Sequence, residues 1–172
     1  MMSPLVVSIL TLVVSSGLLA SWRGGPPERL AAAIIVGWVL TDALYHVLFG
    51  PSGFEEVDPV HLVLDGAELV AITWLALQAN RMWPMWAAAA QLICVTGHLA
   101  AFVEPVAVRR AYWAMTQLPQ YIQLTALLLG AFAHARRVRR FGPYRSWRVP
   151  KAAPAPAFIA SRHNPPGRID RP

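Results

Sequence analysis

Charged residues are scarce in this 172-residue chain, in which only 14% of the positions are Asp, Glu, Lys or Arg and 56% are hydrophobic. A soluble domain usually carries about 25% charged residues. The few cations are unevenly placed, because ten of the fifteen Lys and Arg lie after residue 135. The net charge of +6 is therefore a property of the C-terminal segment. The body of the chain lacks the basic face that nucleic-acid binding needs, so we expect no nucleic-acid partner.

Cysteine is almost absent as well. The one thiol, Cys94, lies within the apolar stretch "AAAAQLICVTGHLAAF". No internal disulfide is therefore available, and no metal site can be built from cysteines alone. In such a stretch a cysteine is typically a small packing residue. The chain also lacks a Gly-rich phosphate loop and a Ser-His-Asp signature, so the sequence leans away from an enzyme and predicts no catalytic residue.

Long hydrophobic runs are what the sequence has instead. A helix needs about 20 apolar residues to cross the hydrocarbon core of a bilayer. Five such runs occur, and the segments between them are rich in Gly, Pro or charge. We therefore predict an all-α polytopic membrane bundle over residues 1–140, with about five transmembrane helices at 3–21, 30–49, 60–79, 84–103 and 112–134.

The distribution of arginine predicts the orientation of these spans. Cytoplasmic loops are enriched in Lys and Arg, and the fifth run is followed directly by Arg136, Arg137, Arg139 and Arg140. These four residues would also attract anionic lipid head groups at the membrane surface. We expect a multi-pass protein of the bacterial inner membrane, N-out and C-in. Residues 141–172 form a basic Pro-, Ala- and Arg-rich segment, which we predict to be a disordered cytoplasmic tail.

Ionisable side chains inside the predicted spans are the most informative feature. An acidic group at the centre of a membrane helix costs about 2.5–3.5 kcal/mol on insertion scales, and such groups usually face the bundle interior and pair with one another. In the third span, His61, Asp65 and Glu68 share one helical face at i, i+4 and i+7. In the second span, Asp42 and His46 are four residues apart. All five residues fall in the outer half of the predicted membrane.

Two further spans place polar groups at the same depth. His98 lies near the outer end of the fourth span, and the fifth span contributes Gln117, Gln120 and Gln123 as candidate binding residues. This coincidence of depth in four spans predicts a single buried polar cluster. Protons, water, histidine or a cation must balance its carboxylates from within the bundle.

Histidine combined with carboxylate is a ligand set of zinc, manganese and iron. Helix bundles build such sites from side chains that point inward. The sequence therefore predicts a divalent metal site with six candidate ligands, or a haem held by two of the three histidines. The candidate ligands are Asp42, His46, His61, Asp65, Glu68 and His98.

Two other functions fit the same residues. Buried polar side chains fix the register of membrane helices, so the protein could be a non-catalytic accessory or assembly subunit that binds other membrane subunits. Chains of Asp, Glu and His also relay protons or small ions, although the inner halves of the spans are mostly apolar. The sequence leaves cofactor binding, assembly and transport open.

The segment "NRMWPMWAAAAQL", together with the following His98, resembles uncharacterised small integral membrane proteins of alphaproteobacteria. The resemblance covers about residues 60–135 and implies a bacterial membrane location. It implies no activity.

Overall fold

The described part of the chain is all-α, as predicted. The computed structural model describes residues 4–50, 58–103 and 109–148, and no β-strand is formed there apart from one isolated bridge between Ala79 and Trp147. Each helix coincides with one of the five predicted hydrophobic runs. The helices are α1 (Pro4–Arg23), α2 (Pro26–Phe49), α3 (Pro59–Gln78), α4 (Trp83–Val103) and α5 (Arg109–Phe141).

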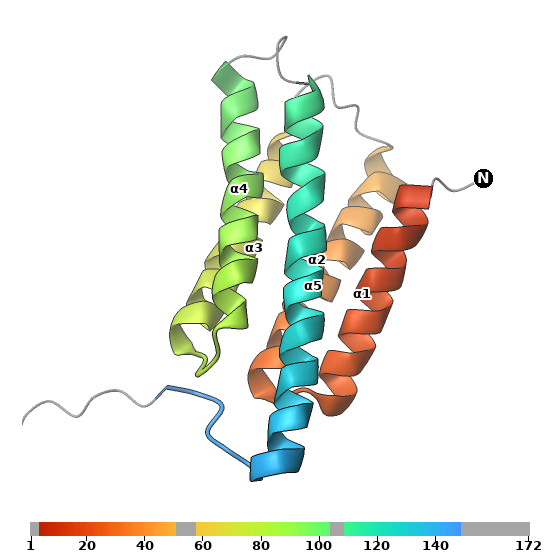
Figure 1. The fold of residues 1–172 in the computed structure, drawn as a ribbon. Coiled ribbons are helices and arrows are strands. Elements are labelled where there is room, and N and C mark those ends of the chain that lie inside the picture. The colour runs from red at the N-terminus through yellow and green to blue at the C-terminus, as the bar shows by residue number, and fades with distance from the viewer. Residues whose placement is uncertain (1–3, 51–57, 104–108, 149–172) are drawn as a thin grey trace, which may run out of the picture.

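The helices form a closed ring in chain order (Figure 1). Each helix packs against the next one, and α5 returns to contact both α1 and α2. Successive helices run in opposite directions, so the α1–α2 and α3–α4 connections lie at the same end of the bundle, here called the turn end. The C-terminus of α2 and the N-terminus of α3 lie at the other end, here called the site end.

The outside of the bundle is apolar. Large side chains such as Leu40, Val47 and Val63 are each more than 60% exposed. Two helices, Pro26–Phe49 and Pro59–Gln78, are long and apolar enough to cross a membrane. Only 11% and 28% of their most apolar windows are buried, whereas the core helix of a soluble protein would be mostly covered. These helices therefore present an apolar surface of the kind that marks contact with a membrane or a partner.

The apolar core fills the half of the bundle next to the turn end. Ile72, Leu75 and Leu127 are almost completely buried there. Most other members of this core are alanines, whose small side chains let helix backbones approach closely. The alanines are Ala20, Ala31, Ala32, Ala79, Ala87 and Ala131.

A fully buried carboxylate, Glu28, joins the two connections at the turn end. Its Oε1 accepts hydrogen bonds from Arg81 Nε at 3.1 Å and from Trp83 Nε1 at 3.0 Å, and its Oε2 accepts one from the Gly25 N–H at 3.0 Å. The neighbouring position 24 accepts only glycine, because a Cβ atom there would lie 2.3 Å from the Ala20 carbonyl oxygen. Glu28 therefore holds the start of α2 against the α3–α4 connection.

The chain after α5 folds back across the turn end. The Asn80 N–H donates to the Ser146 carbonyl oxygen at 3.0 Å, and the Arg148 N–H donates to that of Gln78 at 2.8 Å. Two guanidinium groups lie over the ring of Tyr144, with the Cζ atoms of Arg81 and Arg137 at 4.3 Å and 4.1 Å from the ring centroid. The segment predicted as a disordered tail thus begins with an ordered stretch, and residues 149–172 lie outside the described residues.

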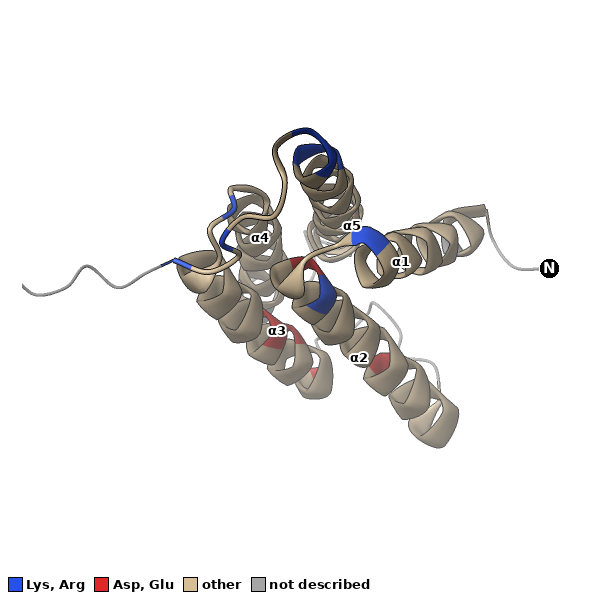
Figure 2. Ribbon diagram, turned by 90° about the horizontal axis from the view of Figure 1, so that it is seen from below, with Lys and Arg blue, Asp and Glu red and all other residues tan. Residues whose placement is uncertain are grey.

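The four arginines predicted to lie at the lipid surface occupy the last turns of α5. All four, Arg136, Arg137, Arg139 and Arg140, are exposed. Figure 2, which views the bundle from the turn end, shows Lys and Arg gathered at this end. Their placement at an end of the bundle, away from its apolar sides, is compatible with the predicted contact with head groups.

We predict that Glu28→Gln destabilises the bundle. The substitution leaves the Arg81 guanidinium, with a side chain only 7% exposed, without its carboxylate partner. Breaking a buried ion pair from one side costs about 3–5 kcal/mol. Thermal unfolding of the purified protein in detergent measures the loss. Arg29→Gln is the matched control, because the neighbouring Arg29 is exposed; equal melting temperatures for the two variants would contradict the prediction.

Candidate metal centre

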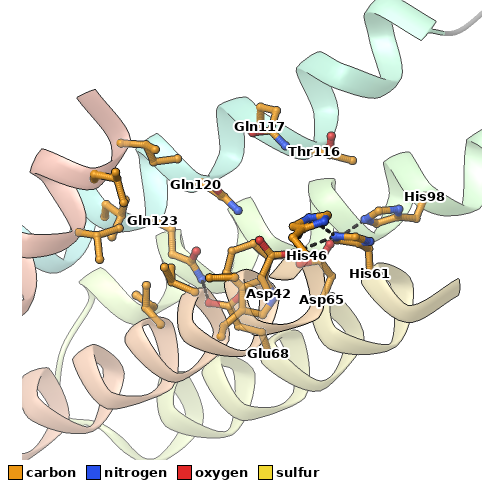
Figure 3. A pocket seen from close by; sticks show the side chains of 18 of the residues that line it. Asp42, His46, His61, Asp65, Glu68, His98, Thr116, Gln117, Gln120 and Gln123 are labelled. Atoms are coloured by element: carbon orange, nitrogen blue, oxygen red, sulfur yellow. Dashed lines mark hydrogen bonds and ion pairs between the residues drawn. The ribbon is translucent and has the colours of Figure 1, made fainter. Parts of the chain in front are cut away.

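A cavity of about 470 Å³ occupies the site-end half of the bundle (Figure 3). Residues of all five helices line it. The cavity lies above the apolar core, with Ile35 and Leu124 shared between the two. All nine polar residues singled out from the sequence line this cavity: Asp42, His46, His61, Asp65, Glu68, His98, Gln117, Gln120 and Gln123.

The structure separates the six predicted metal ligands into two groups and one remaining residue. The first group, here called the open triad, consists of Asp42 and His46 on α2 and His61 on α3. His61 Nε2 lies 2.9 Å from Asp42 Oδ1 and 3.3 Å from His46 Nε2. His46 Nε2 lies 3.6 Å from the same Asp42 oxygen. Three potential ligand atoms thus converge on one point.

The second nitrogen of each histidine is held by a hydrogen bond. His46 Nδ1 lies 3.1 Å from the Gly50 carbonyl oxygen, and His61 Nδ1 lies 3.1 Å from Asp58 Oδ2. A carbonyl oxygen and a carboxylate accept hydrogen bonds and do not donate them. Both Nδ1 atoms are therefore donors. In a neutral ring Nε2 then carries the lone pair, whereas a protonated His61 ring donates from Nε2 to Asp42 Oδ1, 2.9 Å away.

The convergence of lone pairs gives the open triad its chemical character. With both Nδ1 atoms protonated, two imidazole lone pairs and one carboxylate oxygen face one another. Such an arrangement is repulsive unless a cation or an added proton lies between the atoms. The triad also remains accessible, since the side chains of Asp42 and His46 are 25% and 33% exposed.

Asp58 holds the His61 ring from outside α3. It is the N-cap of α3, where its Oδ1 accepts a hydrogen bond from the Val60 N–H at 2.9 Å. Its Oδ2 accepts a second one from the Tyr45 hydroxyl at 2.8 Å. Burial alone would raise the pKa of Asp58, but these hydrogen bonds and the nearby His61 outweigh it and lower the pKa below its ordinary value. Asp58 is therefore an anionic acceptor for the His61 ring.

The second group, here called the closed triad, consists of Asp65, Cys94 and His98, and all three residues are buried. His98 Nε2 donates to Asp65 Oδ2 at 2.6 Å, and Cys94 Sγ donates to the same oxygen at 3.4 Å. Gln91 Nε2 donates to Asp65 Oδ1 at 3.2 Å, and the Tyr112 hydroxyl lies 3.0 Å from His98 Nδ1. Every ligand atom of this triad is already engaged in a hydrogen bond.

The remaining predicted ligand, Glu68, belongs to neither triad. Its Oε1 accepts a hydrogen bond from Gln123 Nε2 at 2.9 Å. Gln120 and Gln117 lie about one and two turns nearer the site end of α5, and their side chains make no hydrogen bond to other described residues. The three glutamines predicted as a binding set therefore divide into one structural partner and two free amides.

Several residues of these networks escaped the sequence reasoning. Cys94 was assigned to packing, although its spacing of four from His98 places both on one helical face. Gln91 lies a further turn away on the same face of α4. Asp58 lies before the apolar run and therefore outside the predicted span, although its position directly before a Pro-initiated helix indicates an N-cap.

No protein-family model, no curated protein and no solved structure matches this chain.

We predict that Asp65→Asn loosens the bundle more than Glu68→Gln does. The two carboxylate oxygens of Asp65 accept hydrogen bonds from three side chains. In asparagine an NH2 group replaces one of these oxygens and would face one or more of the donors. Each buried polar group left unpaired costs about 1–3 kcal/mol. Glutamine at 68 keeps an oxygen for Gln123.

Maleimide labelling of Cys94 in detergent gives a local measure of this effect, because the thiol is 1% exposed in the native bundle. We expect faster labelling and a lower melting temperature in Asp65→Asn, with Glu68→Gln close to the native protein. Native labelling rates in Asp65→Asn would show that the closed triad is dispensable for packing.

Proposed function

We propose that this chain is an integral protein of the bacterial inner membrane that binds one divalent transition-metal ion in the open triad. All five helices would cross the bilayer, N-out and C-in, which places the triad in its outer half. The observation that carries the proposal is the convergence of His46 Nε2, His61 Nε2 and Asp42 Oδ1, with both Nδ1 atoms held by acceptors.

The distances within the open triad suit a shared ion. Metal–nitrogen and metal–oxygen bonds of about 2.0–2.2 Å at angles between octahedral and tetrahedral values separate neighbouring ligand atoms by about 2.9–3.5 Å. The separations in the triad are 2.9, 3.3 and 3.6 Å. Movements of a few tenths of an ångström therefore bring the three atoms to ligand positions.

The hydrogen bonds around the triad support the same proposal. Metal-binding histidines usually donate their other ring N–H to a carboxylate or a backbone carbonyl. Here Asp58 supplies the carboxylate for His61, and Gly50 supplies the carbonyl for His46. Both rings are thereby held with Nε2 toward the shared point.

Two histidines and one carboxylate suit zinc or iron(II). Such a set leaves coordination positions open, and the open side of this triad faces the cavity. A metal held there would act as a Lewis acid on an oxygen ligand that enters from the cavity. The proposal is therefore a ligand-binding metal centre within the bundle.

The geometry favours a metal ion over the alternative of a haem. Axial ligands lie on opposite faces of the porphyrin, with the macrocycle between them. His46 and His61 instead have Nε2 atoms 3.3 Å apart, both near one carboxylate oxygen. The third histidine, His98, has both ring nitrogens engaged by Asp65 and Tyr112.

The apolar core argues against the transport alternative. On the turn-end side of Glu68 and Gln123, the interior is filled by Ile72, Leu75 and Leu127 before the next buried ionisable group, Glu28, is reached. No chain of polar side chains crosses this layer in the described residues. A purely structural role in an assembly subunit suits the closed triad, whose polar groups are paired, better than the open triad.

Metal analysis tests the proposal directly. We expect the protein, purified in detergent without chelator, to bind one zinc or cobalt(II) ion per chain. Cobalt(II) bound by nitrogen and oxygen ligands should give visible d–d bands. His61→Ala and Asp42→Asn should each weaken metal affinity by about 10- to 100-fold or more, since they remove a ligand outright.

His98→Gln and His134→Gln are the controls for the metal experiment. His98 belongs to the closed triad, and His134 lies at the turn end, where its Nδ1 is 3.1 Å from Arg81. We expect both variants to retain one ion per chain. A native protein without stoichiometric metal, or equal losses in His61→Ala and His98→Gln, would refute the open triad as the site.

The proposed orientation has its own test. Single cysteines are introduced at Arg23 and at Val47 in a Cys94→Ala background, and intact cells are treated with a membrane-impermeant maleimide. Arg23 lies at the turn end and Val47 is exposed near the site end. We expect labelling at 47 only, because an N-out arrangement places the turn end in the cytoplasm. Labelling at 23 only would reverse the orientation.

A further inference from the structure

We propose that the ligand of this metal centre is an acyl amphiphile with an anionic oxygen head group, a carboxylate or a phosphate, which enters from the lipid between α1 and α2. The inference rests on the proposed metal site and names the class of molecule that the site takes. Its basis is a single cavity that is polar on one side and aliphatic on the side that opens between these two helices.

The helices α1 and α2 diverge from the turn end toward the site end. At the level of Gly17 and Val36 they are still in contact, because a Cβ atom on Gly17 would lie 3.6 Å from Val36 Cγ2. Nearer the site end α1 leans on α5 instead, where Ser8 Oγ lies 2.9 Å from the Tyr121 hydroxyl. Figure 2 shows the two helices separating along their length.

The separation opens the cavity on the side of the bundle. Leu10 on α1 and Ala43 on α2 both line the cavity and are both exposed. That surface is the apolar one described above, which a bilayer would cover. A molecule that reaches the metal centre through this opening therefore comes from the lipid phase.

The wall along this opening is aliphatic. On α1 it consists of Ile9, Leu10 and Val13, and on α2 it includes Ile35 and Val39. An acyl chain lying against these side chains removes their apolar surface and its own from water. A small polar metabolite would leave the wall without a partner, so the wall favours a ligand with a hydrocarbon chain.

The cavity also contains free hydrogen-bond donors, on α5 and on α2. The amides of Gln117 and Gln120 have no partner among the described residues. Trp38 lines the same cavity, and its Nε1 is the one buried side-chain nitrogen or oxygen without a hydrogen bond in the described residues. Together with a cation in the open triad, these donors favour a head group with anionic oxygens.

The cobalt(II) protein provides the test, because a head-group oxygen that binds the ion changes its d–d bands. Palmitate, lysophosphatidate, hexadecanol and acetate are titrated in non-ionic detergent. We expect palmitate or lysophosphatidate to shift the bands at concentrations at least about tenfold lower than acetate, because burial of the chain adds to affinity. Hexadecanol, which has no anionic oxygen, should leave the bands unchanged. The stronger of the two anions identifies the head group.

Two matched variants test the route between α1 and α2. Ala43→Phe fills the opening with a ring, whereas Ala33→Phe adds the same ring at an exposed position of α2 that does not line the cavity. Both should bind cobalt(II) with native bands and respond to acetate. Only Ala43→Phe should lose the response to palmitate, by about tenfold or more in concentration.

The outcomes separate the two proposals. If cobalt(II) binds but no long-chain anion shifts its bands, or acetate acts at the same concentration as palmitate, the amphiphile is wrong and the metal centre stands. Equal responses of the two phenylalanine variants would overturn entry between α1 and α2. A native protein that binds no cobalt(II) overturns the metal centre and this inference together.

Discussion

The buried hydrogen bond between Asp65 and His98, only 2.6 Å long, is the contact on which the site-end half depends. A carboxylate inside an apolar bundle must be balanced by neighbouring groups, because neither lipid nor an aliphatic core can solvate it. Asp65 on α3 receives its three side-chain donors from α4, and Tyr112 extends the network to α5. This one carboxylate thereby fixes the rotation of α4 about its axis and the depth of α3 beside it.

The two ends of the bundle stabilise their buried carboxylates with different kinds of partner. At the turn end, the carboxylate of Glu28 meets a permanent cation, Arg81, and every one of its acceptor contacts is made inside the protein. At the site end, the closed triad is balanced by neutral or titratable donors. The alanine-rich core lies between the two ends and keeps them electrically separate. The cavity can therefore form at the site end without weakening the contacts of Glu28 at the turn end.

Much of this arrangement follows from helical spacing, and the rest depends on how helices are rotated against one another. The intervals among His61, Asp65 and Glu68 predict a shared inward face, and the structure buries Asp65 and Glu68 as expected. The same intervals do not reveal that this face meets α2 at His61 and α4 at Asp65. The predicted cluster thus divides into two triads, because the polar face of α3 contacts α2 at one level and α4 at another. Glu28 and the chain after α5 could not be assigned from the sequence, since their partners come from distant connections.

The division also explains why the closed triad suits a structural role and the open triad suits the binding of a ligand. Asp65, Cys94 and His98 are buried with all their polar atoms paired, so an entering ion would have to break hydrogen bonds before forming its own. In the open triad, the hydrogen bonds to Gly50 and Asp58 lie on the far nitrogens of His46 and His61, and the near nitrogens of both rings share one Asp42 oxygen. An ion there takes the place of a proton shared between His61 and Asp42 and leaves the hydrogen bonds to Gly50 and Asp58 intact. The open triad therefore gathers three acceptor atoms at one accessible point in the wall of the cavity beside α1 and α2.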